Sequence, residues 1–377
     1  MKTQAAVLNE AGAPMTVERV DLGGPGPGEV LVRVAACGAC HSDLHILKGE
    51  WAGFVPPIVV GHEGAGVVEA VGEGVDTVAP GDHVVLGWKT YCGKCRSCVN
   101  GWPHLCDQPP MLAESSALSK DGIQIGRMLV SAFLAEYAVV PYSVAIPIRK
   151  EMRLDVASLL GCAVMTGVGA AMNTAQVRPG TTVAVFGCGG VGVNVIQGAA
   201  LCGAARIIGV DVHDDKLTYA RAFGMTDAVN ARATDPVEAI LALTHGVGVD
   251  YAFEAAGNAR VIEQVYASLA KRGMGVIVGM PAFREQTNVS LPIMPFYGER
   301  WMTGSYYGGA RLWRDIPRLV DLYLRDKLVL DLQAARHYPL DAVNEAFADL
   351  EGGKPGRGVI VMHEEHHSAL GRDGALT

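Results

Sequence analysis

The chain has 377 residues and a formal net charge of −8, with 31 Lys and Arg against 39 Asp and Glu. This acidic balance, without a basic stripe, excludes nucleic acid as the expected partner. The sequence has no run of about 18 uncharged apolar residues, which excludes a membrane span. The length predicts about two domains. Since MKTQAAVLNE has no basic and apolar signal region, we expect a cytoplasmic protein.

Up to about residue 90, the sequence predicts short strands separated by turns. The runs EVLVRVAAC (29–37), GAGVVEAVGEG (64–74) and DHVVLGW (82–88) are rich in β-branched residues, and turns such as PGPGE and APGDH separate them. This pattern predicts an all-β, barrel-like unit in which no helix of any length is needed.

A cluster of thiols follows in the run CGKCRSCVNGWPHLC. Disulfide frameworks belong to short secreted domains, whereas closely spaced thiolates in a reducing cytosol are typical of a tetrahedral zinc site. Four sulfurs complete the metal shell and leave no position for substrate, so the predicted site is structural. Its ligands are Cys92, Cys95, Cys98 and Cys106.

From about residue 180, strand-like and helix-like segments alternate, which predicts βαβ units and a parallel sheet. The segments are TTVAVFG, VGVNVIQGAALCG, ARIIGVD, DDKLTYARAFG, VDYAFEA, NARVIEQVYASLAKRG and GMGVIVGM. Amphipathic helices are then expected from WRDIPRLVDLYLRDK to LDAVNEAFADLEGG, before a short strand, GVIVM. We expect the tail, with His363, His366 and His367, to be a frayed terminus.

A glycine motif lies between the first predicted strand and helix of this region and comprises Gly187, Cys188, Gly189, Gly190, Val191 and Gly192. In this context, Gly187 permits a tight turn, Gly189 lets the backbone approach a pyrophosphate, and Gly192 lets the helix pack close to the sheet. Asp211 ends the next strand and would bind the adenosine ribose, with Lys216 as a second contact. An acidic residue at position 211 would repel the 2′-phosphate of NADP and therefore favours NAD. A glycine-rich turn without a ligand is the alternative.

Three further segments contain candidates for a second metal site. ACGACHSDLH holds Cys40, GHEGAG holds His62, and GCAVMTG holds Cys162. A set of two thiolates and one imidazole leaves the fourth zinc position open for substrate, as catalytic zinc requires. These residues are far apart along the chain, so their spacing does not show that they bind one metal. A purely structural role for GHEGAG therefore remains the alternative.

Together, GHEGAGVV, CGKCRSC, GCAVMTG, VFGCGGVG and IIGVD resemble the zinc-dependent alcohol dehydrogenases of the medium-chain dehydrogenase/reductase family. The resemblance runs from AAVLNEAG to GRGVIVM and fails only in the tail and in part of residues 107–135. It implies a catalytic zinc on Cys40, His62 and Cys162, with Glu63 as an occasional alternate ligand and Asp43 orienting the histidine. Cys37 would pack within a strand and would not bind the metal.

The resemblance also implies two Zn²⁺ per chain and NAD as cofactor. Zinc would stabilise the alkoxide of an alcohol, hydride would pass to NAD, and Ser42 would pass the proton through the nicotinamide ribose to His45 and solvent. Other implied cofactor-binding residues are His41, Thr166 and Arg357.

For the substrate, a small-molecule alcohol or aldehyde, the resemblance places Trp51 and Trp88 in the pocket, where indoles would favour small primary alcohols. Met280, Ser305 and Tyr306 match the inner pocket wall. Longer aliphatic, terpenoid or benzylic alcohols remain open.

The implied fold is α/β with an all-β part: a GroES-like catalytic domain, residues 1–163 and 307–377, and a Rossmann-type doubly wound coenzyme domain, residues 164–306. The active site would lie in the cleft between them. The strand near GERWMTGSY would pair across a two-fold axis and give a homodimer or homotetramer.

Three alternatives remain. A glutathione-dependent formaldehyde dehydrogenase would need a cationic anchor, which residues 107–120 do not clearly supply. A dehydrogenase could instead hold NAD permanently and recycle it with an external acceptor. A regulatory nucleotide-binding protein would have little reason to retain the set Cys40, His62, Cys162, Ser42 and His45.

Overall fold

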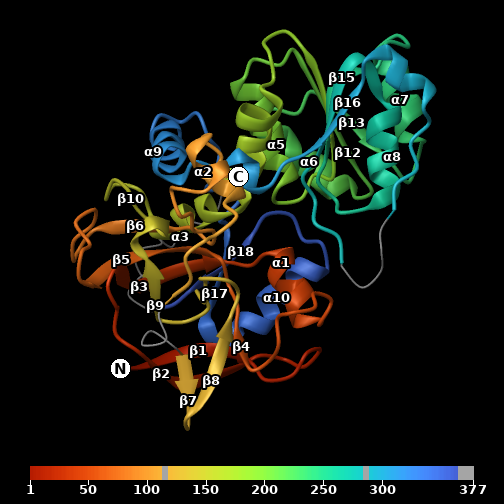
Figure 1. Ribbon diagram of the computed structural model, residues 1–377. Helices are drawn as coiled ribbons and strands as arrows, with labels where there is room; N and C mark the ends of the chain where they lie inside the picture. The colour runs from red at the N-terminus through yellow and green to blue at the C-terminus, as the bar shows by residue number, and fades with distance from the viewer. Residues whose placement is uncertain (113–117, 283–287, 364–377) are drawn as a thin grey trace.

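A computed structural model describes residues 1–112, 118–282 and 288–363. Within these residues the chain forms a closed barrel, a seven-stranded mixed sheet and a six-stranded sheet. Figure 1 shows the six-stranded sheet with its helices in the upper part of the molecule, and the barrel and mixed sheet below it. His366 and His367 of the tail lie outside the described residues.

The barrel and the mixed sheet contain the strands expected before residue 90 and several others. The barrel strands are β1 (Lys2–Leu8), β2 (Thr16–Leu22), β4 (Ile58–Val59), β7 (Leu118–Lys120) and β8 (Ile123–Arg127). The mixed sheet contains β3 (Glu29–Gly38), β5 (Glu63–Val71), β6 (His83–Leu86), β9 (Tyr137–Pro141), β10 (Ala145–Pro147), β17 (Arg336–Pro339) and β18 (Gly358–Val361). Because β18 pairs antiparallel with β3, the C-terminal part of the chain completes the N-terminal sheet.

The prediction that no helix is needed before residue 90 is wrong. Helix α1 (His41–Leu47) follows β3 directly and buries Leu44, Ile46 and Leu47. Its acidic first turn contains Asp43, a favourable position for a carboxylate near a helix N-terminus. His45 therefore lies on this helix.

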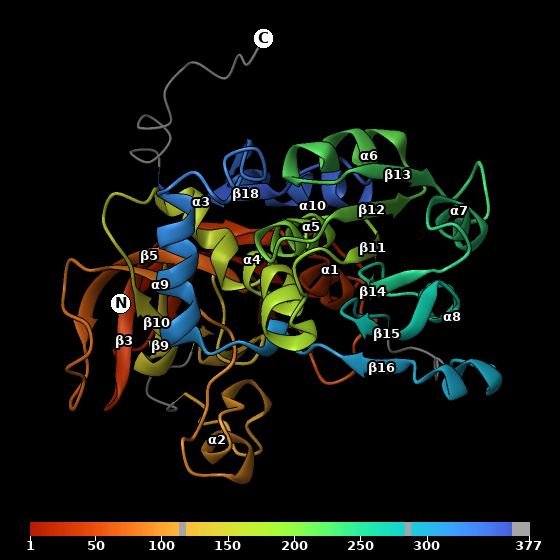
Figure 2. The same cartoon turned by 90° about the horizontal axis from the view of Figure 1, so that it is seen from above.

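The remaining helices around the mixed sheet are short. They are α2 (Arg96–Val99), α3 (Leu154–Ser158), α4 (Ala163–Gly169), α9 (Leu312–Tyr323) and α10 (Val343–Glu351). Single-turn or irregular helices join them: η1 (Pro103–Leu105), η3 (Tyr142–Val144), η4 (Leu159–Gly161), η5 (Ala170–Ala175), η8 (Tyr307–Gly309) and η9 (Leu340–Ala342). Figure 2 shows that the lobe around α2 projects from the body of the molecule.

The six-stranded sheet is parallel throughout, as predicted, with the order β13-β12-β11-β14-β15-β16. Its strands are β11 (Thr182–Phe186), β12 (Arg206–Asp211), β13 (Asp227–Asn230), β14 (Val249–Glu254), β15 (Leu269–Ile277) and β16 (Trp301–Gly304). Between them run α5 (Gly192–Leu201), α6 (Asp214–Ala220), η6 (Arg221–Phe223), α7 (Pro236–Leu243), α8 (Ala259–Ala267) and η7 (Met294–Gly298). The chain order reverses between β11 and β14, which creates a crevice at the carboxyl ends of the strands.

Side chains alternate between the two faces of this sheet, as strand geometry requires. Val183 and Val185 pack in one core with α5 and α6, whereas Ala184 and Phe186 pack in another with α7 and α8. One predicted boundary is wrong: the helix expected over NARVIEQVYASLAKRG ends at Ala267, and β15 begins at Leu269. Leu269 pairs with Val249 of β14, and from Met274 the strand pairs with both β14 and β16; this pairing outweighs the helix propensity of the residues that start the strand.

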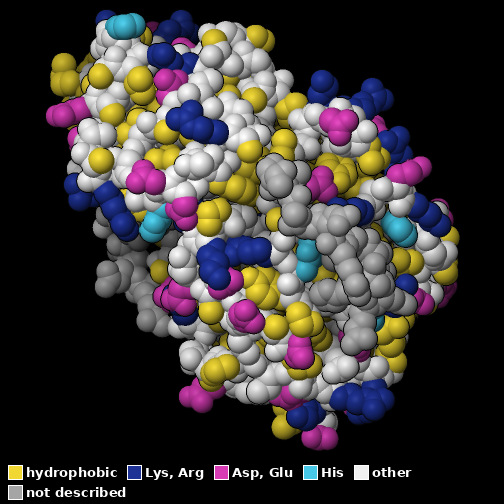
Figure 3. All heavy atoms as spheres, turned by 180° about the vertical axis from the view of Figure 1, so that it is seen from behind, with side chains coloured by type: hydrophobic (Ala, Val, Ile, Leu, Met, Phe, Trp, Pro, Cys, Tyr) yellow, Lys and Arg dark blue, Asp and Glu magenta, His cyan; other side chains and the backbone are white. Residues whose placement is uncertain are grey.

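No single helix of the described chain is long and apolar enough to cross a membrane. Leu154–Gly161 and Ala163–Ala175 reach that composition only as a pair bent by 53°. On the face seen in Figure 3, basic and acidic side chains are interspersed.

Candidate active site

Three distant segments bring four potential metal ligands together. Cys40 is the N-cap of α1, His62 and Glu63 stand at the start of β5, and Cys162 is the N-cap of α4. Their ligand atoms all lie within 4.8 Å of one another, and all four residues are buried. Two sulfurs, an imidazole nitrogen and a carboxylate form a donor set that suits Zn²⁺.

Asp43 holds the histidine of this cluster. Its Oδ1 lies 3.0 Å from His62 Nδ1 and accepts a 2.9 Å hydrogen bond from the amide of Gly61. Burial opposes the charge on His62, but the adjacent Asp43 and Cys40 outweigh it and raise the pKa of His62 well above its ordinary value. With Nδ1 facing Asp43, Nε2 is the nitrogen available to a metal.

A buried ion pair crosses the same cluster. Arg357 Nη2 donates to Glu63 Oε1 at 2.9 Å and lies 3.6 Å from Cys40 Sγ. Burial raises the pKa of Glu63 to about 8, although Arg357 opposes this shift. A hydrogen bond from Cys162 lowers the pKa of Cys40 well below its ordinary value, and the charge of Arg357 adds to this effect. The arginine therefore supplies positive charge to a site rich in anionic donors.

The glycine motif has the geometry of a phosphate cradle. A Cβ on Gly192 would lie 1.7 Å from the carbonyl oxygen of Gly187, while a Cβ on Gly189 would meet nothing within 4 Å. Gly192 is thus needed for the close turn, and the backbone at Gly189 is open to a ligand. Arg357 Nε is buried without a partner among the described residues and would lie 2.7 Å from a Cβ on Gly190. An orphaned cationic donor beside this loop fits a bound pyrophosphate.

Asp211 stabilises the glycine loop itself. Its Oδ2 accepts from the amide of Cys188 at 2.8 Å, and its Oδ1 accepts from the amide of His213 at 3.0 Å. Cys188 is buried, and burial raises the pKa of its thiol, so it acts as a packing residue. Lys216 is partly buried on α6, close to Gly353.

The predicted proton-relay residues lie on α1, one turn apart. Ser42 is partly buried, His41 is exposed, and His45 Nδ1 lies 2.6 Å from Glu50 Oε2. The His45 ring stacks on Trp51 with centroids 5.3 Å apart. The indole of Trp51 donates to the carbonyl oxygen of Pro281 at 3.2 Å, so it connects the segment after α1 to the segment after β15. The sequence did not predict the contact with Glu50, because a residue five positions after His45 does not lie on the same face of a helix as the histidine.

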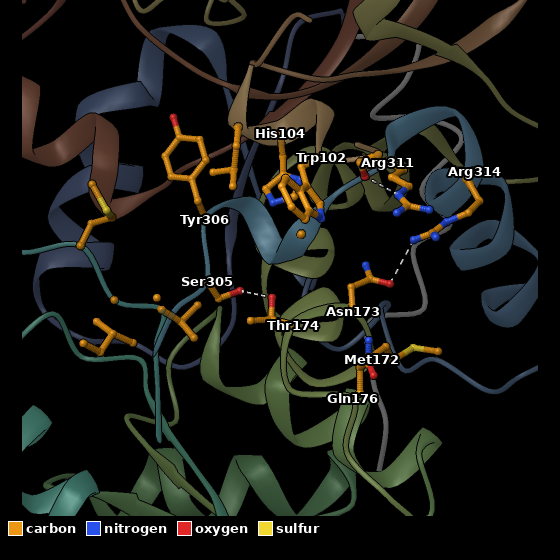
Figure 4. A pocket seen from close by; sticks show the side chains of 18 of the residues that line it. Trp102, His104, Met172, Asn173, Thr174, Gln176, Ser305, Tyr306, Arg311 and Arg314 are labelled. Atoms are coloured by element: carbon orange, nitrogen blue, oxygen red, sulfur yellow. Dashed lines mark hydrogen bonds between the residues drawn. The ribbon is translucent and has the colours of Figure 1, made fainter. Parts of the chain in front are cut away.

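Aromatic rings enclose the other side of the metal cluster. Trp88 stands edge-on to His62 at 6.4 Å, stacks on Tyr307 at 4.2 Å, and meets the edge of Tyr306 at 5.5 Å. Thr166 is buried, with its Oγ1 4.0 Å from Cys162 Sγ. Figure 4 shows a large cavity lined by Tyr306 and Ser305; Met280 also lines it.

The second thiol cluster forms the core of the projecting lobe. The ligand atoms of its four cysteines lie within 4.8 Å of one another. The amide of Cys92 donates to Cys106 Sγ at 3.2 Å, and that of Cys95 donates to Cys92 Sγ at 3.3 Å. Amide donors from Lys94 and Cys95 lower the pKa of Cys92 to about 6. Four sulfurs held in this way suit a closed zinc site.

Two family models match the sequence: the alcohol dehydrogenase GroES-like domain over residues 26–150 and the zinc-binding dehydrogenase domain over residues 190–325. Solved structures match as well. An alcohol dehydrogenase zinc-binding domain protein from Burkholderia ambifaria is 35% identical, with a TM-score of 0.91 over 96% of this chain and 99% of that one. Benzyl alcohol dehydrogenase from Acinetobacter calcoaceticus is 30% identical, with a TM-score of 0.90 over 96% and 100%.

A zinc-binding dehydrogenase from Sinorhizobium meliloti, described as bound to NADP, is 27% identical, with a TM-score of 0.81 over 96% and 100% of the two chains. The fold and these matches define a zinc-binding oxidoreductase with a GroES-like domain and a nucleotide-binding sheet. The chain belongs to the zinc-dependent alcohol dehydrogenases of the medium-chain dehydrogenase/reductase family, as its motifs predicted.

Proposed function

We propose that this chain oxidises alcohols to aldehydes or ketones, reversibly, with NAD and a zinc ion held by Cys40, His62 and Cys162. The observation that carries the proposal is the convergence of these three buried side chains, from segments far apart in sequence, within 4.8 Å of one another. A structural thiol site on the four cysteines at 92–106 brings the total to two zinc ions per chain.

When bound, the zinc supplies Lewis-acid chemistry that makes the hydroxyl proton of an alcohol removable near neutral pH. The chain itself handles that proton. Ser42 accepts it and passes it toward His45, whose Nδ1 faces Glu50 and whose Nε2 is therefore the basic nitrogen. Trp51 and Trp88 exclude water with their indole rings, while Asp43 keeps His62 in the tautomer that binds metal.

The glycine loop, His41, Thr166 and Arg357 would hold the cofactor. We assign NAD rather than NADP because Asp211 ends β12 with a carboxylate, which repels a 2′-phosphate. A relative at 27% identity is described as bound to NADP, so the preference needs a direct test. Initial rates with each cofactor at equal concentration provide it: faster turnover with NADP would overturn the assignment.

The decisive experiment for the function combines metal analysis with turnover. Cys40→Ala should lower the zinc content from two ions per chain to one and abolish alcohol-dependent NADH formation, because two remaining ligands bind catalytic zinc weakly. Cys202→Ala is the matched control, since Cys202 caps α5 outside both clusters. Full activity in Cys40→Ala, or equal zinc loss in both variants, would refute the proposal.

The proposal extends to organisation. We place the catalytic domain at residues 1–163 and 307–377 and the coenzyme domain at residues 164–306, with the site in the cleft between them. We further propose a homodimer or homotetramer formed along β16, and a cytoplasmic location. The latter agrees with nine cysteines that form no disulfide with one another, as expected in a reducing compartment.

A further inference from the structure

One cavity extends beyond the groups that the proposed chemistry uses. It has a volume of about 1010 Å³ and lies between the zinc-lobe segment 101–105, the end of η5, the ends of β15 and β16, and the start of α9. In the view of Figure 4, Ser305 and Tyr306 lie on one side, and Arg311 and Arg314 lie on the other. None of the metal ligands lines it.

The cavity adjoins the candidate active site at one end. Met280, Ser305 and Tyr306 line it, and the ring of Tyr306 meets Trp88, which in turn meets His62. One indole therefore separates the cavity wall from a metal ligand. A molecule that reacts at the metal and reaches the cavity therefore passes Trp88 and runs along Tyr306.

The far end of the cavity is cationic. Among the described residues that line it, two are arginines and none carries a carboxylate, in a chain whose net charge is −8. The guanidinium of Arg314 is already neutralised, since it donates to both carboxylate oxygens of Asp315 at 2.6 and 3.0 Å.

Arg311 differs from Arg314. Its Nε donates to the carbonyl oxygen of Gly101 at 2.9 Å, and its guanidinium makes no ion pair within the described part of the chain. The neighbouring His104 has a buried Nδ1 for which the described part of the chain supplies no hydrogen-bond partner. Arg311 is exposed at the mouth of the cavity and is oriented by its hydrogen bond to Gly101. An oriented cation beside aromatic rings, with the amides of Asn173 and Gln176 nearby, is a site for a carboxylate on an apolar body.

We propose that this cavity binds the distal carboxylate of an alcohol or aldehyde substrate, and that Arg311 anchors it. This inference rests on the proposed function and names the substrate class of the same site. The hydroxyl or carbonyl end of such a molecule lies toward His62, its apolar part along Tyr306, and its carboxylate at Arg311. A neutral alcohol leaves the cation without a partner, so the site favours the acid.

The test compares an acid with its neutral isostere. For the zinc-loaded enzyme, kcat/KM for 4-(hydroxymethyl)benzoate should exceed that for 4-(hydroxymethyl)benzamide, and raised salt should reduce the difference. Arg311→Gln should lower the ratio of the two values about tenfold, as expected for loss of a charge-assisted contact. Arg311→Lys keeps the charge and should retain part of the ratio. Arg318→Gln, an exposed arginine on the same helix, should leave it unchanged.

Carboxylates could come from a simple hydroxy acid or from a glutathione adduct. A parallel assay with formaldehyde and glutathione distinguishes these sources, and dependence on Arg311 in either arm supports the anchor. Calorimetry with benzoate against benzamide needs no turnover, so it still tests the cavity if no alcohol is oxidised. Equal binding and equal kcat/KM for acid and amide, or ratios that fall equally in Arg311→Gln and Arg318→Gln, would overturn the proposal.

Discussion

His45 is held on two sides by residues that follow it within six positions. Glu50 Oε2 faces its Nδ1 at 2.6 Å, the amide of Glu50 donates to its carbonyl oxygen at 2.8 Å, and the ring of Trp51 stacks against it. A carboxylate in this position fixes the tautomer and stabilises the imidazolium that forms when the ring accepts a proton. Glu50 is therefore a positioning residue for the proposed relay.

Glu50→Gln keeps the shape of this contact and removes its charge. We expect kcat to fall about tenfold while the KM for NAD changes little, because a charge-assisted hydrogen bond is about twice as strong as a neutral one. The ¹⁵N shifts of His45 should also show loss of the Nδ1–H tautomer. Glu10→Gln, an exposed change outside the site, is the control. Unchanged shifts and kcat would show that Glu50 does not position the ring.

Sequence identified the candidate ligands of both metal sites because their donor chemistry is carried by residue type. Cys40, His62 and Cys162 could be named before their convergence was visible. The pairing of Arg357 with Glu63 could not, because the two residues are 294 positions apart and only the pairing of β18 with β3 brings their segments together. The same holds for Arg311, whose role depends on a cavity wall assembled from distant segments.

At the scale of elements, alternation of strands and helices after residue 180 was sufficient to predict the parallel sheet. Local propensity did not predict α1, a helix of seven residues that is stabilised by burial in the N-terminal core and by contact with α10. It also did not predict the strand that starts at LAKRG, where Leu269 pairs with β14. Both errors involve short segments whose conformation is decided by tertiary contacts.

The turn between β11 and α5 allows the two functions of its glycines to be separated. Gly192→Ala should destabilise the fold by about 1–3 kcal/mol, because its Cβ would meet the Gly187 carbonyl oxygen at 1.7 Å. Gly189→Ala meets nothing within 4 Å and should leave the melting temperature unchanged, yet weaken NAD binding where the backbone approaches the pyrophosphate. Thermal melts and NAD titrations measure both effects. Equal melting temperatures for both variants would contradict this assignment.

Asp155 connects α3 to β17, the C-terminal edge strand of the mixed sheet. It accepts from Arg153 Nη2 at 2.6 Å, and its Oδ2 lies 2.9 Å from His337 Nε2. Burial alone would raise the pKa of Asp155, but His337 and Arg153 outweigh it and lower this pKa. A lowered pKa in the folded state stabilises the protein above the ordinary pKa of aspartate, and this contribution is lost as pH falls through the folded value.

Asp155→Asn should therefore lower the free energy of unfolding by about 2 kcal/mol at neutral pH. The difference from the wild type should begin to shrink below about pH 4, where the Asp155 carboxylate of the unfolded chain becomes protonated, and should disappear once the pH falls below the lowered pKa of the folded state. Denaturant titrations at several pH values measure this, with the exposed Asp326→Asn as control. A difference that is constant down to acidic pH would show that the charge of Asp155 is not responsible.

At the scale of the whole molecule, β16 is one of the two edge strands of the six-stranded sheet in the described chain, and β13 is the other. Trp301 on this strand is 61% exposed, and the preceding segment exposes Ile293, Met294 and Tyr297 by 69%, 71% and 79%. An open strand edge beside exposed apolar side chains offers a template for pairing with another chain, which supports the proposed assembly along β16. Figure 2 shows that β16 lies at the margin of the molecule.

Trp301→Glu should convert the proposed dimer into monomers, because pairing two copies of β16 would bring two buried carboxylates together across the two-fold axis. Sedimentation velocity measures the change. Val55→Glu places the same charge on a residue that is 74% exposed in the other part of the chain, and it should leave the sedimentation coefficient unchanged. Since neither metal cluster includes a residue of β16, both variants should retain two zinc ions per chain. A wild-type monomer, or a dimer that survives Trp301→Glu, would place the assembly surface elsewhere.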